Sequence, residues 1–446
     1  MTPSSRRLIA TTVTALGVFA LVASPAQAAE IAVPCDPGVL VQAIADANAT
    51  TTPDTLSLAA NCVYALTAVA DTTDSAGLPA VKGKLTIKGN NATIARAKDA
   101  PQFRIISNWG DLSLDKVTIT GGHAPDGVGT DAAGKGKGGE DGGGIENWGP
   151  LTITDSVITG NTAGSGAPGV DATATTSAGT GGNGGFGGGI YSYSSSRITL
   201  TITGGSVAGN SAGAGGRGGI GVAANSGGLG GVGGFGGGAV AQGSTALRIT
   251  GSSITGNSAG AGGPGGAGGA ERARAGGGGH GGTGAGVFLA TSRGVLLNPV
   301  IAGTSIAGNV AGRGGDGGVA GPDGYSGYSG DGGSGGGLSV FSDSLTLDGG
   351  KISDNAVGEP GAGSYPFPEA SFGGGIYTLG GRVTLANGAV VSGNRPDNCS
   401  SVADVPGCVN GSGARAAGAD GQERRAADLA TVEAAVSARS GARVRG

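Results

Sequence analysis

The stretch that decides the fold is GGGIENWGPLTITDSVITGNTAG, residues 142–164, because altered forms of it recur along the chain. It returns as GGGIYSYSSSRITLTITGGSVAGNSAG at residues 187–213 and as GGGLSVFSDSLTLDGGKISDNAVG at residues 335–358. A catalytic motif is normally needed once. A segment that is copied along the chain instead indicates a structure built by stacking similar units.

Seven copies become visible when the segments are aligned on the residue that closes each one. Neighbouring closing residues are 39 (122 to 161) to 52 (257 to 309) positions apart. Six copies end in Asn and the first ends in Gly122. The closing Asn residues are Asn161, Asn210, Asn257, Asn309, Asn355 and Asn394.

Each copy contains short runs in which apolar residues alternate with polar ones, such as Leu151 and Ile153. Alternation of this kind predicts a short strand with one buried face. No helical pattern separates the copies, and one copy cannot bury its apolar face alone. We therefore predict an all-β fold, a single-stranded parallel β-helix in which each copy forms one turn, with about 4.8 Å between turns. Residues 54–66 and 85–95 are expected to supply opening turns.

The recurrent Asn has a structural interpretation, since Asn tolerates the left-handed backbone of a tight corner and its amide can bond the next turn. We expect a ladder of stacked Asn side chains. The tripeptide Asn-Trp-Gly occurs at 108–110 and at 147–149, so Trp109 and Trp148 are expected to stack on each other. Sugar binding by exposed aromatic rings is the alternative interpretation of this pair.

The composition is dominated by glycine, with 102 Gly in 446 residues, against a usual share of about 7%. Much of the glycine lies between the copies, in inserts that leave the repeat at the same point. Because they leave at the same point, these inserts must project as long loops from one edge of the molecule. Long loops are tolerated there since the entropy cost of closing a loop grows only slowly with its length. Composition leaves open whether they are disordered or stack as extended polyglycine strands.

The chain divides into four parts. Arg6 and Arg7, the apolar stretch 8–22 and a small-residue cleavage site predict a signal peptide over residues 1–28, by the Sec or the twin-arginine route. Residues 29–102 hold a capping helix and the first turns, residues 103–410 the repeats, and residues 411–446 a tail expected to be mobile. The helix covers residues 37–49 and places one apolar side toward the end of the stack: Val39, Leu40, Ala43, Ile44 and Ala47.

Four cysteines remain after export to an oxidising compartment, where an even number favours disulfides. Three pairings are possible, and the local one, Cys35 with Cys62 and Cys399 with Cys408, is the simplest. The second bridge is expected to close the C-terminal end of the stack. We expect a secreted protein, extracellular or associated with the cell wall, and no further apolar run is long enough to cross a bilayer.

The motif GG[GA][IV] followed by [IV]xxN occurs at residues 143–145 with 158–161, 188–190 with 207–210 and 374–376 with 391–394. It resembles the repeat of the polymorphic outer-membrane proteins, over residues 103–395. The resemblance implies a right-handed β-helix of the pectin-lyase-like superfold and a surface-exposed, adhesin-like role. The chain looks more like the exported β-helix proteins of Gram-positive bacteria.

Enzymes of that superfold cleave polysaccharides with clustered carboxylates and a positioned cation. The best candidates here are Asp111, Asp115, Glu146 and Asp155 with Lys116 as the cation. We favour solvated corners for these residues and a non-catalytic function, with a polysaccharide lyase or glycoside hydrolase as the alternative. No cofactor or metal is indicated, the net charge of −4 gives no reason to expect nucleic acid, and the expected partners are cell-wall polysaccharide or a host or cell surface.

Overall fold

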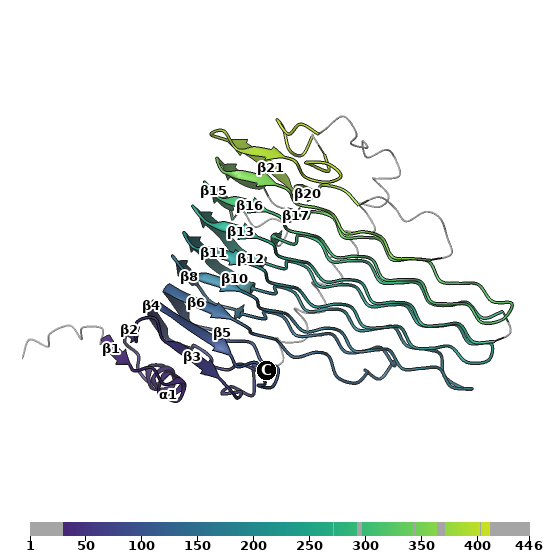
Figure 1. Cartoon of the computed structure of the whole chain (residues 1–446), viewed down its shortest axis with the longest axis horizontal. Helices are drawn as coiled ribbons and strands as arrows, with labels where there is room; N and C mark the ends of the chain where they lie inside the picture. Colours follow the sequence, from purple (N-terminus) through teal and green to yellow (C-terminus); the bar gives the residue numbers. More distant parts are fainter. Residues whose placement is uncertain are drawn as a thin grey trace, which may run out of the picture.

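The computed structural model describes residues 30–270, 272–291, 297–341, 344–363, 371–401 and 403–410. The predicted signal peptide and the predicted mobile tail lie outside these residues. Among the described residues there are one helix, α1 (Pro37–Asn48), and strands β1 to β22. The strands form one large sheet in which every pairing between named strands is parallel (Figure 1).

The sheet folds into three columns of strands, because the chain passes through the same three positions in every repeat. Strands that follow one another in a column come from successive repeats. Most strands of column 1 start directly after a glycine triplet; β14 follows Gly-Ala-Gly and β5 follows Ile105. Column 1 contains β5 (Ile106–Asn108), β7 (Ile145–Asn147), the first part of β10 (Ile190–Thr203), the first part of β12 (Ala239–Thr250), β14 (Val287–Thr291), β17 (Leu338–Phe341) and β20 (Ile376–Leu379).

Columns 2 and 3 hold the remaining strands. Column 2 contains β1 (Glu30–Val33), β2 (Asp54–Leu58), β8 (Leu151–Thr154), β15 (Val300–Ala302), β18 (Ser344–Asp348), β21 (Arg382–Ala386) and parts of β4 (Lys84–Arg96), β6 (Asp111–Thr120), β10 and β12. Column 3 contains β3 (Val63–Leu66), the ends of β4 and β6, β9 (Val157–Thr159), β11 (Ser206–Ala208), β13 (Ser253–Thr255), β16 (Ser305–Ala307), β19 (Lys351–Ser353) and β22 (Val390–Ser392).

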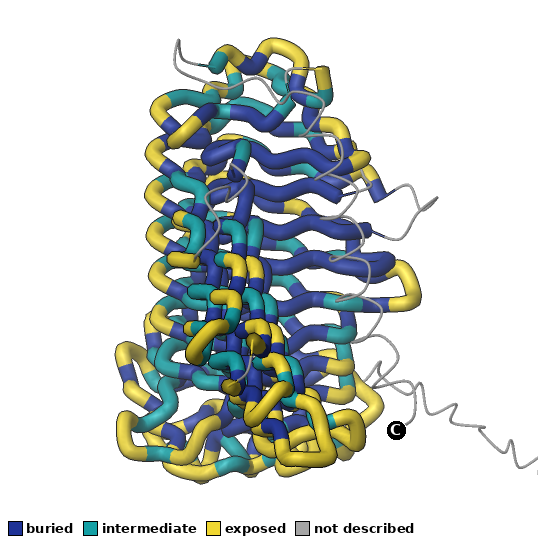
Figure 2. Tube along the Cα trace, turned by 90° about the vertical axis from the view of Figure 1, so that its right-hand side faces the viewer, coloured by how far each residue is buried: buried dark blue, intermediate teal, exposed yellow. Residues whose placement is uncertain are grey.

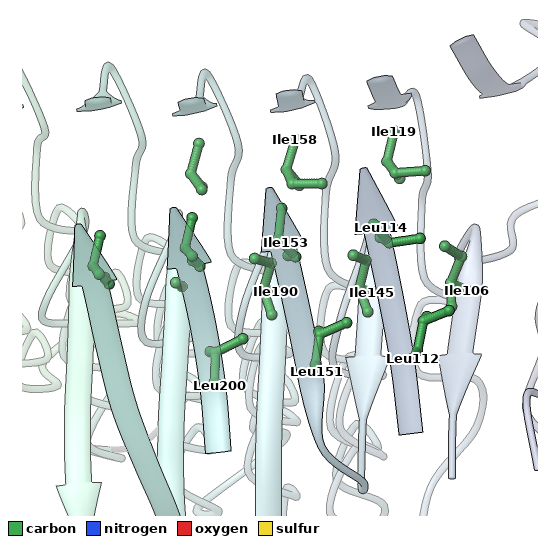
Figure 3. Packing of buried hydrophobic residues seen from close by; sticks show 14 of the residues in the cluster. Ile106, Leu112, Leu114, Ile119, Ile145, Leu151, Ile153, Ile158, Ile190 and Leu200 are labelled. Carbon is green, nitrogen blue, oxygen red and sulfur yellow. The ribbon is translucent and has the colours of Figure 1, made fainter. Parts of the chain in front are cut away.

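The register explains why the same apolar residues recur. Leu151 pairs with Leu200, and Ile158 pairs with Val207. Equivalent side chains therefore lie in rows along the stack, as Figure 3 shows for Leu112, Leu151 and Leu200. These rows form the main core, which all three columns line and which each repeat extends by one layer. The alternating pattern in the sequence is the pattern of this inward face.

Column 1 is buried on its opposite face as well. Tyr191, Val240 and Phe288 point away from the main core and are at most 2% exposed. They pack with Phe186 and Phe235, which precede glycine triplets, in a second apolar cluster. Neighbouring rings are in contact, with centroids 4.6 Å apart for Phe186 and Phe235 and 5.1 Å for Phe235 and Phe288. The strands of column 1 thus divide two cores.

The glycine-rich inserts are ordered, extended arms that project from one edge of the stack (Figure 1). Within an insert the outgoing arm and the returning arm bond to each other through every third residue, as Gly185 donates to Gly164, Gly182 to Ala167, and Gly179 to Val170. A three-residue period without hydrogen bonds inside a segment is that of the polyproline II conformation. The arms of successive repeats also bond to one another, so together they form what we call the glycine slab.

Glycine is required inside the slab by close approach of the backbones. A Cβ atom on Gly263 would lie 2.0 Å from the carbonyl oxygen of Gly216, and one on Gly230 would lie 1.9 Å from that of Gly263. Real Cβ atoms do not approach closer than about 3.0 Å. Viewed from the slab side in Figure 2, buried segments of successive layers lie one above another, and exposed residues gather at the turns.

Both ends of the stack are covered. α1 lies at the N-terminal end (Figure 1) and buries Leu40, Ala43, Ile44 and Ala47. Its N-cap is Asp36, whose carboxylate accepts bonds from two main-chain N–H groups of the first turn. The prediction that Val39 joins the buried side is wrong, since Val39 is 41% exposed. It precedes Leu40 in the helix and therefore lies about 100° around the axis from it.

The C-terminal end is covered by residues 397–410. Cys399 pairs with Ile376 of β20, and the main-chain N–H of Val383 in β21 donates to Asp404. The disulfides join Cys399 to Cys408 and Cys35 to Cys62, which are the predicted pairs. Unpaired strand edges are templates for aggregation, and these segments occupy the outer strands of columns 1 and 2.

Candidate functional site

The recurrent Asn residues form a continuous hydrogen-bonded row. The Oδ1 atom of Asn210 accepts from both the main-chain N–H and the Nδ2 of Asn161, each at 3.0 Å. The Nδ2 of Asn210 also donates to the carbonyl oxygen of Ile158 in the preceding repeat, at 2.9 Å. The same pattern repeats along the row, which consists of Asn161, Asn210, Asn257, Asn309, Asn355, Asn394 and then Asn398.

The expected reason for Asn at this corner needs correction. The left-handed residue is the one before the Asn, with φ of 62° at Gly160, 61° at Gly209 and 58° at Asp354. Asn is placed there by its side chain, which is buried and bonds to both neighbouring repeats. At the first repeat, where Gly122 replaces Asn, its main-chain N–H still donates to Asn161 Oδ1 at 2.9 Å.

The Asn row also explains the glycine triplets. A Cβ atom on the third glycine of a triplet would meet the amide of the Asn that closes the same repeat, at 3.0 Å for Gly144 and Asn161 and at 2.9 Å for Gly337 and Asn355. The first glycine of each triplet has a φ of 64° to 66°. The glycine triplet and the closing Asn of each repeat therefore meet at one corner, where they have a structural role.

The two tryptophans are stacked. The rings of Trp109 and Trp148 are nearly parallel, with 7° between their planes and 5.1 Å between centroids, and Tyr193 of the next repeat meets Trp148 edge-on at 5.4 Å. Trp109 Nε1 donates to Asp74 at 2.6 Å. Trp109 is 45% exposed, so this pair is both a packing element and an accessible aromatic surface.

The predicted carboxylate set does not form one site. Asp111 begins β6 and is paired with Lys84 at 3.1 Å. Asp115 lies four residues further along the same strand, about 13 Å away. Lys116 and Asp155 are exposed, left-handed residues at the turns between columns 2 and 3, in neighbouring repeats. This geometry agrees with solvated corners.

The expectation of a solvated position is wrong for Glu146, the remaining member of that set, which is 1% exposed and lies in a buried charged cluster in column 1. Arg104 has no exposed surface and contacts Glu146 at 3.2 Å and Glu140 at 2.6 Å. Arg104 also donates to the carbonyl oxygen of Asp141. In the register of column 1, Glu146 pairs with Tyr191. The charged cluster therefore ends the second apolar cluster at its N-terminal side.

Sequence reasoning missed this cluster because its members occur once. Position 146 is aligned with Ser107 in one neighbouring repeat and with Tyr191 in the other. No period identifies such a position, and Glu140 and Arg104 are brought to it only by the stacking. A guanidinium without exposed surface cannot touch a substrate, so the cluster has a structural role.

The most accessible variable side chains lie on the glycine slab. Along the arms two residues in three face other backbones; the third faces away from the slab, outward along most of the arm and, nearest the stack, toward the second apolar cluster, as Val232 and Phe235 do. On the returning arms the carbonyl oxygens of Tyr325 and Tyr328 accept from Ala275 and Gly278 of the preceding repeat, so these two residues have the same orientation. Their rings are 63% and 55% exposed.

Comparison of the chain with protein-family models, with curated proteins and with solved structures finds no match. Among the described residues, no helix has the length and apolar character to cross a membrane. Within the same residues, no group of three or more His, Cys, Asp or Glu is placed to hold a metal ion.

Proposed function

We propose that the protein is an exported, right-handed parallel β-helix that acts without catalysis as a surface-binding, adhesin-like protein. The parallel pairing of equivalent strands in three columns supports the β-helix. The observation that carries the function is the placement of its side chains. Accessible aromatic and apolar residues are displayed on flat slab faces, whereas Arg104 and Glu146 are buried in an ion pair.

The two disulfides support export, because such bonds persist in oxidising compartments. A rod of stacked repeats with long projecting arms offers a large, rigid binding area. Its expected partners are cell-wall polysaccharide or a host or cell surface, the partners implied by a polymorphic outer-membrane protein-type repeat.

The alternative of a polysaccharide lyase or hydrolase is less well supported. Glycosidases place their two carboxyl groups about 5 to 10 Å apart around the scissile bond. Of the candidate residues, Asp111 is bound to Lys84 and Glu146 is inaccessible. The two carboxylates that do converge, Glu140 and Glu146, share the buried Arg104.

The test combines binding and turnover. The chain without its predicted signal peptide is incubated with bacterial cells, host cells and a glycan array, and in parallel with pectin, alginate and cell-wall glycans. We expect saturable binding and no release of soluble sugars. Product release that is lost in Asp111→Asn or Asp155→Asn variants would favour the enzyme, and failure to bind any cell or glycan would refute the proposal.

A further inference from the structure

The positions of the returning arms that face away from the slab form a regular grid, which we call the return-arm face. Three positions in each of three layers define it: Ser226, Leu229 and Val232; Arg274, Gly277 and His280; Tyr325, Tyr328 and Asp331. Each layer is fixed to the next by bonds from slab N–H groups to the carbonyl oxygens of these residues, at 2.8 to 2.9 Å. The grid is therefore rigid, although it consists of loops between repeats.

Two tyrosines stand on this face in one row. Tyr325 and Tyr328 are three residues apart on one arm, which is one turn of polyproline II and an advance of about 9 Å. This advance is close to the length of a disaccharide unit in an extended β-1,4-linked glycan. Tyr rings are apolar on their faces and polar at the hydroxyl, which suits the apolar face and hydroxyl edges of a sugar.

The neighbouring positions add a gap and polar groups. Leu229 is 57% exposed and leans toward Gly277, where a Cβ atom would lie 3.5 Å from its Cδ2 atom. The nearest backbone atom to this Cβ position is the carbonyl oxygen of Tyr328 at 3.6 Å, so Gly277 has no overly close neighbour and presents no side chain between Leu229 and Tyr328. Arg274 lies over the Tyr325 ring, with 5.6 Å from the guanidinium carbon to the ring centroid.

The charge of the face favours a neutral ligand. Arg274 is the cation, Asp331 is the anion, and His280 contacts Asp331 at 3.3 Å. A stable protein interface covers about 800 Å² per partner around a continuous apolar centre. The exposed apolar groups here are instead spaced apart and surrounded by hydrogen-bonding groups, an arrangement that suits a flat, polyhydroxylated chain.

We propose that the return-arm face binds an extended, uncharged β-linked polysaccharide, whose sugar rings stack on Tyr325 and Tyr328. Hydroxyl groups of the glycan would bond to Asp331, His280 and Arg274. This inference rests on the proposed surface-binding function and names the ligand class for it.

The test is sedimentation of the purified chain with microcrystalline cellulose and chitin, which are uncharged, and with peptidoglycan, whose peptide stems are charged; binding to peptidoglycan alone would contradict an uncharged ligand. We expect a Tyr325→Ala/Tyr328→Ala variant to lose about 5- to 150-fold in affinity, the effect of removing two aromatic contacts. The Tyr325→Phe/Tyr328→Phe variant retains the rings and should keep most of the binding. The matched control is Val319→Ala, because Val319 is 74% exposed on the outgoing arms, which form the opposite face of the slab.

The outcomes separate the two proposals. If the chain binds cells but none of the three polysaccharides, the proposed function stands and the ligand class is wrong. Equal binding by the wild type and the double Ala variant, or an equal loss in Val319→Ala, would also overturn the inference. Hydrogen exchange of the slab amides in each variant shows whether a loss of binding reflects unfolding, and an unfolded Ala variant is replaced by the single Tyr328→Ala variant.

Discussion

Replacing Gly279 by Ala should open the glycine slab, whereas the same replacement at Gly277, two residues away in the same arm, should not. A Cβ atom on Gly279 would lie 1.9 Å from the carbonyl oxygen of Gly231 and 2.6 Å from its carbon. The nearest atom to a Cβ on Gly277 is 3.5 Å away. Neither glycine has a positive φ, so the comparison isolates close approach from backbone strain.

The expected loss of slab stability follows from the hydrogen bonds around Gly279. To reach an ordinary contact distance, the layers holding residues 231 and 279 must separate by more than 1 Å. Three hydrogen bonds of 2.8 Å are then stretched: Gly263 N to Gly231 O, Gly279 N to Gly263 O, and Gly315 N to Gly279 O. At about 1 kcal/mol each, and with overpacking of about 1 to 3 kcal/mol, we expect a local loss of about 4 to 6 kcal/mol.

Hydrogen–deuterium exchange of slab peptides is the appropriate assay, because a slab can open without unfolding the stack. A loss of about 4 to 6 kcal/mol accelerates exchange about 700- to 20,000-fold. Gly277→Ala should change exchange little, or slow it slightly, because Ala reduces the freedom of the unfolded chain. Equal protection in both variants would refute the close packing of the arms.

Three other changes test the corner, the charged cluster and the C-terminal end. Asn257→Ala should cost about 2 to 4 kcal/mol in denaturant unfolding, because two donors of Asn210 lose their buried acceptor; a cost below 1 kcal/mol would contradict a stabilising row. Arg104→Ala should cost about 3 to 5 kcal/mol by removing the cation that contacts the buried Glu146 carboxylate, which is measured in the same way, with Arg104→Met/Glu146→Gln expected to recover part of the loss. Burial raises the pKa of Asp397 above its usual value although its carboxylate accepts two main-chain bonds. Its contribution to stability is therefore complete below the unfolded pKa and is lost as the pH rises through the folded pKa, so Asp397→Asn should flatten the fall in melting temperature as the pH rises above about 4; an unchanged pH profile would contradict this assignment.

The columns of strands could be predicted because their signal is local and repeated. Leu151 and Ile153 alternate with polar residues, and the same alternation returns in each repeat. Stacking then requires equivalent residues to pair in parallel, as Leu151 and Leu200 do. The row of Asn side chains was visible in the alignment for the same reason, although the left-handed residue proved to be its predecessor, such as Gly160.

The slab and the second apolar cluster could not be predicted in the same way. The glycines at 213, 216 and 219 have a period of three, but a flexible linker has the same composition. What orders them is bonding to an arm that returns later in the chain and to arms of other repeats. Likewise, Tyr191 and Phe186 are ordinary residues in the sequence, and only the folding of one arm onto column 1 brings their rings together.

The three-residue period of the slab limits which changes in insert length keep the glycines in their bonded positions. The bonds nearest the stack join Gly164 to Gly185, Gly213 to Gly234, and Gly260 to Gly282, which span 21, 21 and 22 residues. The extra residue of the third insert is absorbed at the tip, and its arms keep the phase of their neighbours. Insertions of one triplet in each arm would lengthen the slab, while a single inserted residue within an arm would put every glycine beyond it out of step. The arms can thus grow or shrink during evolution only in threes, whereas the tips can take up single residues.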